Sequence, residues 1–176
     1  MKAVEVINRL IEGYNTRNTD EIDTFMENFS NETDSQMIGI GATEPGEYEW
    51  FTGKSEIKEI VISDWSNWGK VHFDLESLRL TERRETAWFS ICATLEQMEM
   101  SEETWQFFLS QMKELLSNQN MKASDRMFEA SHFGIRRVRE KNLGVGYPYK
   151  MIVTGHLVLE NESWKVHTLH WSMPVE

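Results

Sequence analysis

Apolar residues recur every three or four positions in three segments near the start of the chain, which is the spacing of an amphipathic helix. The first segment covers about residues 4–14 and the second about residues 22–29, with Thr19-Asp20-Glu21 between them as a cap and acidic first turn. Two short antiparallel helices are therefore expected to open the fold. A third helix, about residues 54–68, follows Gly53, and its apolar stripe consists of Ile57, Ile60, Val61, Trp65 and Trp68.

In the later parts of the chain apolar and polar side chains alternate, which predicts strands. Two short extended pieces, residues 37–40 and 47–51, flank a turn at residues 43–46. Four long strands are expected at residues 71–80, 85–97, 150–160 and 163–173. This order of elements predicts an α+β fold.

Residues 98–147 interrupt the strands with helical signals, and we interpret them as an insertion into a single domain that spans residues 1–176. Apolar residues at helical intervals mark the first half of this insertion: Trp105, Phe108, Leu109, Met112, Leu115 and Leu116. In the second half, Met127, Ser131, Ile135 and Val138 share one helical face. An extended chain from Phe133 onward is the alternative for that half.

Acidic side chains outnumber basic ones by 29 to 18, which gives a net charge of -11. Such a charge repels phosphate backbones and anionic lipid, so neither nucleic acid nor a membrane is expected as a partner. No segment approaches the ~20 apolar residues of a membrane span, and the N-terminal pattern lacks the uninterrupted apolar run of a signal peptide. The single cysteine, Cys92, cannot form an internal disulfide, and a reducing, cytoplasmic location is expected.

The strand at residues 85–97 carries no charged side chain on either face from Thr86 until Glu96. A sheet whose two faces are both uncharged needs a cover on each face. The helices supply one cover, and a second subunit is the simplest source of the other. We therefore expect a homodimer that forms through the sheet.

The last strand carries aromatic, imidazole and hydroxyl groups on positions that should be buried. Strict alternation gives two faces, one with Trp164, Val166, Thr168, His170 and Ser172 and the other with His167, Leu169, Trp171 and Met173. Only one of these two histidines can then point inward, while His156 approaches the same interior from the neighbouring strand. The seven tryptophans and nine phenylalanines suit either a cavity that accepts an apolar guest or an aromatic core without one.

Asp64 lies in the middle of the apolar stripe of the third helix. A carboxyl group there loses water on folding, which raises its pKa towards the range of a general acid or base. The alternative is a structural carboxylate that accepts hydrogen bonds and orders the core. The sequence contains no HExxH, CxxC or Gly-x-Ser-x-Gly pattern. We therefore expect neither a metal site nor a nucleophilic serine.

This order of elements resembles the SnoaL-like division of the nuclear transport factor 2 superfamily. The resemblance is carried by Tyr14 with Asp20, Gly46-Glu47-Tyr48-Glu49-Trp50-Phe51-Thr52-Gly53, Asp64-Trp65-Ser66-Asn67-Trp68-Gly69, Ala87-Trp88-Phe89-Ser90, and Trp164 with the eight residues that follow it. It implies a cystatin-like cone, in which a curved, mixed or antiparallel sheet packs on three N-terminal helices, encloses an apolar pocket and forms dimers. It also favours His170 with Ser172 as the inward-facing pair. The long insertion departs from the compact family pattern.

The family hosts isomerases, cyclases, dehydratases, hydrolases and association domains, so the resemblance does not select a reaction. Ketosteroid isomerase relatives need a carboxylate base on the first strand after the opening helices. Residues 37–41 contain no acid, so a steroid-type isomerase is disfavoured even though Tyr14 matches the helix of their tyrosine.

We expect a protein that binds a small apolar or aromatic molecule in the cone cavity without a cofactor. If it is an enzyme, Asp64 and His170 would shuttle a proton in a lyase or isomerase reaction. The residues expected to line the cavity are Tyr14, Trp50, Trp65, Trp88, Ser90, His156 and Ser172. The alternative is a non-catalytic oligomerisation or protein-interaction module, in which the helical insertion makes the contacts.

Overall fold

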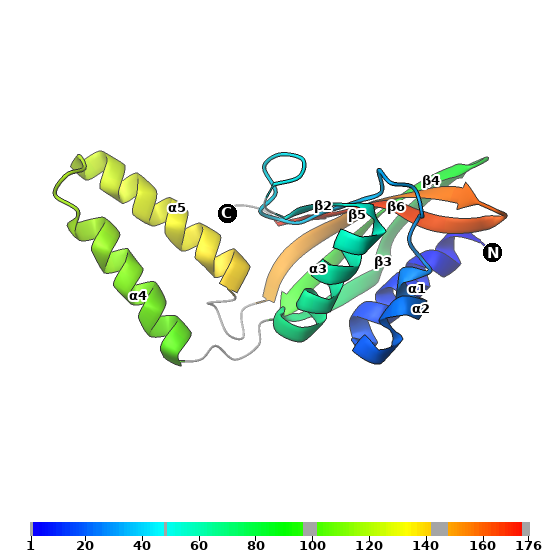
Figure 1. Ribbon diagram of the computed structural model, residues 1–176, viewed down its shortest axis with the longest axis horizontal. Helices are drawn as coiled ribbons and strands as arrows, with labels where there is room; N and C mark the ends of the chain where they lie inside the picture. Colours follow the sequence, from blue (N-terminus) through cyan, green and yellow to red (C-terminus); the bar gives the residue numbers. More distant parts are fainter. Residues whose placement is uncertain (1, 48, 97–101, 142–147, 174–176) are drawn as a thin grey trace. The chain divides into compact units, whose positions relative to one another are not determined.

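The structure is a computed structural model of the 176-residue chain, and it describes residues 2–47, 49–96, 102–141 and 148–173 (Figure 1). The chain divides into two compact units. The first unit comprises Met1–Glu96 and Pro148–Glu176 and contains the sheet, while the second comprises Gln97–Tyr147. The expectation of one domain with an insertion at about residues 98–147 stays a prediction.

The first two helices form where the apolar spacing predicts them. Helix α1 (Ala3–Thr16) ends at Arg17, whose φ of 51° is left-handed and whose N–H donates to the Gly13 carbonyl at 2.8 Å. A 3-10 turn, η1 (Thr19–Glu21), then leads into helix α2 (Ile22–Met26). Helix α2 is shorter than the expected 22–29 because the chain after it pairs with the last strand. In that pairing Ser30 N–H donates to Val166 O, and Val166 N–H donates to Asn28 O, each at 2.8 Å.

Helix α3 (Gly53–Asn67) starts directly after a strand and confirms the third predicted helix. Gly53 permits this abrupt entry because its φ of 79° is readily adopted only by glycine. The buried stripe of α3 consists of Ile57, Val61 and Trp65. These residues pack with α1, α2 and one face of the sheet in a single apolar core.

Six strands form one open, mixed sheet in the order β2-β1-β6-β5-β4-β3 (Figure 1). Their bounds are β1 Gln36–Ile38, β2 Trp50–Thr52, β3 Lys70–Arg83, β4 Thr86–Glu96, β5 Pro148–Glu160 and β6 Ser163–Ser172. Strand β1 is parallel to β6, and all the other neighbours are antiparallel. The predicted α+β fold class is confirmed.

A β-bulge in β6 changes which residues of that strand face the helices. Leu157 lies opposite Val166, but His156 lies opposite Thr168, so His167 is an extra residue on β6. The buried residues of β6 are consequently Trp164, Val166, Leu169 and Trp171. The strict alternation expected from the sequence is therefore wrong after Val166, because one inserted residue moves every later side chain to the opposite face.

The two faces of the sheet need separate names. The helix side carries the core residues, including Phe89, Val153 and Trp171. The outer face carries the alternate residues of β4, β5 and β6, which form three cross-strand rows: Trp88 with His156 and Thr168, Ser90 with Thr154 and His170, and Cys92 with Ile152 and Ser172.

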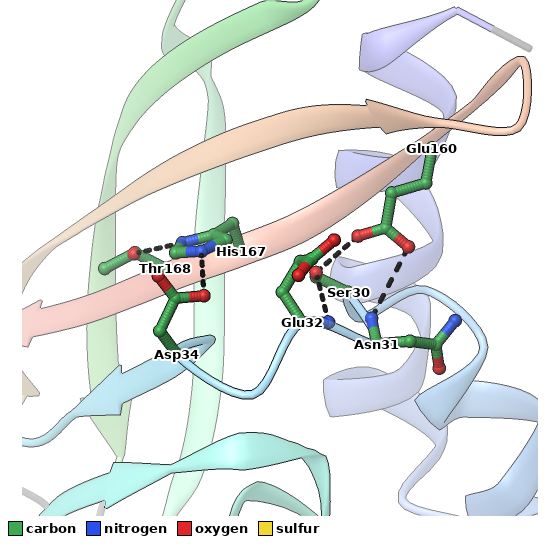
Figure 2. Close-up of polar contacts among 7 residues, drawn as sticks. All are labelled: Ser30, Asn31, Glu32, Asp34, Glu160, His167 and Thr168. Atoms are coloured by element: carbon green, nitrogen blue, oxygen red, sulfur yellow. Dashed lines mark hydrogen bonds and ion pairs between the residues drawn. The ribbon is translucent and has the colours of Figure 1, made fainter.

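The segment between α2 and β1 is attached to the final hairpin by side-chain hydrogen bonds (Figure 2). The Ser30 hydroxyl donates to a carboxylate oxygen of Glu160 at the end of β5, and Asn31 N–H donates to the other oxygen at 3.4 Å. Further along, Asp34 Oδ1 lies 3.1 Å from His167 Nε2, while His167 Nδ1 lies 3.0 Å from Thr168 Oγ1. The bulged residue His167 thus attaches this segment to β6.

The second unit is a helical hairpin, as the sequence predicted for residues 98–147. Its helices are α4 (Glu102–Ser117) and α5 (Ala123–Lys141). The rings of Phe108 and Phe133 stack between them, with centroids 5.8 Å apart and planes 9° apart. The helical interpretation of the chain after Phe133 is correct as far as Lys141, and the ends of the predicted insertion lie outside the described residues.

The close packing of Phe89 on Gly155 generates a stability prediction. A β-carbon at Gly155 would lie 2.2 Å from Cε1 of the buried Phe89 ring. Gly155→Ala should therefore lower the free energy of unfolding by about 1–3 kcal/mol, measured by urea denaturation.

Gly134→Ala on α5 is the contrasting variant, because a β-carbon there would meet nothing within 4 Å. It should leave the stability unchanged or raise it by up to about 1 kcal/mol, since alanine favours helix. A Gly155→Ala protein as stable as the unaltered one would contradict the packing argument.

Candidate functional site

Aromatic rings from both layers of the first unit meet around Tyr14 on the helix side of the sheet. The Tyr14 ring centroid lies 5.0 Å from that of Trp171 on β6, 6.3 Å from that of Trp65 on α3, and 6.3 Å from that of Phe73 on β3. The Trp68 ring contacts Trp171 edge-on, with centroids 5.5 Å apart. Most of these contacts are tilted or edge-to-face, the arrangements that the charge distribution of aromatic rings favours.

Arg17 connects the ends of α1 and α3 beside this aromatic cluster. Its guanidinium donates to the Trp68 carbonyl at 2.8 Å and also to the Gly69 carbonyl, while its Nε donates to the Tyr14 carbonyl at 3.3 Å. A cation at the C-terminal ends of two helices also complements their dipoles. Arg17 is therefore held where its charge acts on both Tyr14 and Asp64.

Asp64 is the titratable group that this environment perturbs most clearly. Its pKa is raised to about 8, chiefly by burial and also by the negative charge of Glu49, while the positive charge of Arg17 opposes both effects. The side chain is half-buried on α3, between the exposed Ser63 and the buried Trp65. At neutral pH the carboxyl group is consequently protonated and can donate a hydrogen bond.

Tyr14 remains a neutral phenol next to this acid. Burial raises its pKa well above the usual value, and nearby Asp64 raises it further, whereas Arg17 lowers it. The phenol therefore keeps its proton throughout the range in which Asp64 titrates.

Glu49 reaches the site from the segment between β1 and β2. Its φ of 58° is left-handed, its carbonyl accepts from Gly39 N–H at 2.8 Å, and its carboxylate accepts from Gly41 N–H at 2.6 Å. A β-carbon at Gly39 would lie 2.6 Å from the Glu49 carboxylate, so only glycine allows this approach. The segment is thus shaped to hold a negative charge within electrostatic reach of Asp64.

The predicted site residues divide between the two faces of the sheet. Asp64, Tyr14 and Trp65 gather on the helix side. The others lie on the outer face: Trp50, Trp88, Ser90, His156, His170 and Ser172. Trp50 belongs there because it pairs with Ile38, which in turn pairs with His170, and its indole N–H donates to Gln36 at 2.9 Å.

The structure does not bring His170 to Asp64. Trp171 points to the helix side and contacts Tyr14, so the preceding residue, His170, points to the outer face. The bulge at His167 is the physical reason, because it reverses the faces that strict alternation would give. A proton shuttle between Asp64 and His170 therefore has no geometric basis in this arrangement.

Several residues of the site were not foreseen as such: Arg17, Glu49, Phe73 and Trp171. Arg17 lies three residues after Tyr14 on the same helical face, which is a local signal that was available. The position of Glu49 depends on a left-handed backbone and two glycines, and that of Trp171 on the bulge. Neither can be read from local periodicity.

Among the described residues, no group of three or more His, Cys, Asp or Glu side chains could hold a metal ion. The chemistry of the site as described rests on a protonated carboxyl group, a phenol, indole rings and one guanidinium.

A family model described as a SnoaL-like domain matches residues 4–119. The chain belongs to the SnoaL-like domain family. The match covers the opening helices, strands β1 to β4 and helix α4. No curated protein matches the sequence, and no described helix of this SnoaL-like protein is both long and apolar enough to span a bilayer.

Solved structures with the same fold have very different sequences. A ketosteroid isomerase-like protein from Erwinia carotovora atroseptica is 12% identical with a TM-score of 0.55, over 98% of this chain and 93% of the other. A candidate NTF2-like dehydratase from Streptomyces avermitilis is 9% identical with a TM-score of 0.56, over 98% and 93%. A candidate calcium/calmodulin-dependent protein kinase type II association domain from Thiobacillus denitrificans is 8% identical with a TM-score of 0.59, over 99% and 96%. Such similarity establishes the fold alone.

The raised pKa of Asp64 predicts how stability changes with pH. Between about pH 4 and pH 8 the folded protein holds a proton on Asp64 that the unfolded chain has lost, so stability falls as the pH rises through this range. Asp64→Asn removes this dependence and should be more stable than the unaltered protein at pH 8, by roughly 2–4 kcal/mol relative to their difference at pH 4. Urea denaturation across this pH range measures the effect.

Two further variants test the cause. Asp20→Asn changes an exposed aspartate and should follow the pH curve of the unaltered protein. Glu49→Gln should lower the pKa of Asp64 and flatten the curve near pH 8, whereas Glu47→Gln, exposed on the same segment, should not. If the Asp64→Asn and unaltered curves run parallel, Asp64 is not protonated in the folded protein.

Proposed function

We propose that this SnoaL-like protein binds a small, largely apolar or aromatic molecule on the helix side of its sheet, beside Asp64. The observation that carries the proposal is a carboxyl group with a pKa of about 8 next to a cluster of aromatic rings. A protein gains nothing in stability from burying a carboxyl group, and perturbed groups of this kind gather at functional sites. The rings of Tyr14, Trp65 and Trp171 make the surroundings of Asp64 apolar and aromatic, which favours an apolar or aromatic guest.

The chemistry open to this site is proton transfer. An acid with a pKa near the operating pH can both donate and accept a proton at little cost. Asp64 alone fills that role in the proposal, since His170 lies on the outer face. A cofactor-free lyase or isomerase reaction is the activity that fits, in keeping with the dehydratase and isomerase names of two solved structures of this fold.

Binding can be measured through the indole N–H signals of the seven tryptophans in a nitrogen-15 NMR spectrum. Titration with naphthalene should shift the signals of Trp65 and Trp171, each assigned by its Trp→Phe variant. The Trp88 signal should stay in place, because Trp88 lies on the outer face and is 49% exposed. Native mass spectrometry of the purified protein adds a search for a retained apolar molecule. Shifts confined to Trp88, or no shift at all, would contradict the proposal.

We further propose that a second copy of the chain covers the outer face. That face is uncharged along β4 between Thr86 and Glu96, although the chain carries a net charge of -11. Trp88 and Ile152 expose 49% and 48% of their surface there, unusually large values for side chains of this kind. Two copies of so acidic a chain can approach closely only where each is free of charge.

Analytical ultracentrifugation should find a dimer, and Ile152→Lys should produce a folded monomer, because the lysine would place an unpaired charge in the apolar interface. Leu75→Lys is the control, since Leu75 is exposed on β3 and belongs to none of the three rows of the outer face, and it should leave the dimer intact. If the unaltered protein is monomeric at about 50 μM, well above the Kd of a stable dimer, the proposal is wrong.

The alternative function is a non-catalytic interaction module based on the second unit. Its described helices expose large apolar side chains to an unusual degree: Phe107, Leu116, Met127 and Phe128. This alternative gains if the protein forms a dimer or larger assembly, while neither naphthalene nor a retained molecule is found.

A further inference from the structure

The five histidines of the chain differ in whether a carboxylate is present to hold a proton on the imidazole. His72 Nε2 lies 2.8 Å from a carboxylate oxygen of Glu96, and His167 Nε2 lies 3.1 Å from Asp34 Oδ1. The two histidines of the outer face have no such partner among the described residues. They lie inside the surface that we propose a second copy covers.

These two histidines occupy neighbouring rows of the outer face. His156 on β5 lies between Trp88 on β4 and Thr168 on β6, and His170 on β6 lies beside Thr154 on β5. Both side chains are partly buried already in the single chain. Because an isologous dimer joins the same patch of both copies, its interface would contain both imidazoles of each copy.

The neighbours of His170 supply no charge to balance a proton on its ring. Beyond Thr154, the same row continues to Ser90 on β4. On the opposite side β1 contributes Ile38, which pairs with Trp50 on β2. None of these four side chains ionises in the ordinary pH range.

The neighbours of His156 include one further imidazole. The rings of His156 and His167 lie with centroids 6.1 Å apart, and the carboxylate of Asp34 is bonded to His167. A proton on His156 would therefore meet a second titratable ring whose own acidic partner is already engaged. Like charges on two neighbouring rings repel each other.

The other charged groups near the rows lie at their borders. On β3, Asp74 pairs with Cys92 and Arg79 pairs with Ser90, while Lys150 on β5 pairs with Thr94. Strand β3 is two strands from β5 and three from β6, which is roughly 10–14 Å at the usual spacing of strands. Salt screens charges at such distances, and Asp74 and Arg79 have opposite signs.

Acid acts on this interface in the opposite direction to its effect on the chain as a whole. Between pH 7.5 and pH 5.5 the main change is the protonation of histidines, which reduces the net charge of -11 and weakens the repulsion between copies. That general effect favours a tighter dimer in acid. A protonated imidazole inside an uncharged interface instead loses its hydration without a carboxylate to compensate, which favours dissociation.

We propose that His156 and His170 make the dimer sensitive to pH, so that it forms near neutral pH and dissociates when these imidazoles are protonated. The inference rests on the proposed dimer, because it assigns a regulation to the same outer face. An imidazole that must release its proton on association weakens binding about 10-fold at pH 5.5, one unit below the ordinary histidine value. One such group on each copy therefore raises the Kd about 100-fold, and two raise it further.

Analytical ultracentrifugation of the full chain at pH 7.5 and pH 5.5 measures the effect. The Kd of the dimer should be about 100-fold or more higher at pH 5.5. Circular dichroism should show a folded chain at both values, because the proton on Asp64 makes the folded protein more stable at pH 5.5 than at pH 7.5.

Variants separate these two histidines from the rest. The double variant His156→Gln with His170→Gln keeps polar side chains that cannot gain a charge, so its dimer should lose the weakening at pH 5.5. His132→Gln is the matched control, because His132 is exposed on α5 in the second unit, and it should keep the pH dependence of the unaltered protein. His170→Lys carries a charge at both pH values and should be a folded monomer at pH 7.5 as well.

Three outcomes are decisive. Weakening at pH 5.5 that the double variant abolishes and His132→Gln retains would support the inference. A Kd that is unchanged or lower at pH 5.5, dissociation that accompanies unfolding, or weakening that persists in the double variant would overturn the inference and leave the proposed dimer in place. A monomer at both pH values at about 50 μM, well above the Kd of a stable dimer, would overturn the proposed dimer and this inference together.

Discussion

The arrangement of the site depends on one extra residue in β6, the bulge at His167. Pairing that stays in register from Trp164 onward would send Trp171 to the outer face and His170 to the helices. The inserted residue reverses this order, so that an indole enters the core and an imidazole leaves it. The same residue contacts Asp34 and thereby attaches the segment before β1 to β6 (Figure 2). A single change of register thus selects the chemical groups that surround Tyr14.

The helix side combines features that oppose one another energetically. Stability is lowered by burial of the Asp64 carboxyl group and of three donors without a partner among the described residues, the Tyr14 hydroxyl and the indole N–H groups of Trp65 and Trp171. Stability is raised by the edge-to-face ring contacts and by the hydrogen bonds of Arg17 to the ends of α1 and α3. Arg17 also moderates the pKa of Asp64, whereas Glu49 raises it. Selection for stability alone would replace the acid and the donors by apolar groups of similar shape. Their presence together is typical of a site whose function costs stability.

Local patterns predicted the helices and long strands well, because each of these elements buries one side at its own period. They also identified Asp64, Tyr14 and Trp65, since a carboxyl group on an apolar helical stripe is visible without knowing its neighbours. The early end of α2 and the bulge were missed. The early end of α2 follows from pairing between residues about 28–30 and β6, which lie far apart in the sequence. The bulge is a shift of register between β5 and β6 that alternation within β6 alone does not reveal. Glu49 was missed for the same reason, because its place depends on Gly39 and Gly41 across a turn.

Alternate residues of strands β4, β5 and β6 form two chemically different surfaces. Towards the helices the rows are apolar, such as Ala87 with Leu157 and Val166. On the outer face the corresponding rows mix hydroxyl, imidazole and exposed apolar groups without a charge. Because side chains on opposite faces of a strand do not touch, a substitution on the outer face leaves the packing around Asp64 intact. The two faces of the sheet can therefore change in sequence independently of each other.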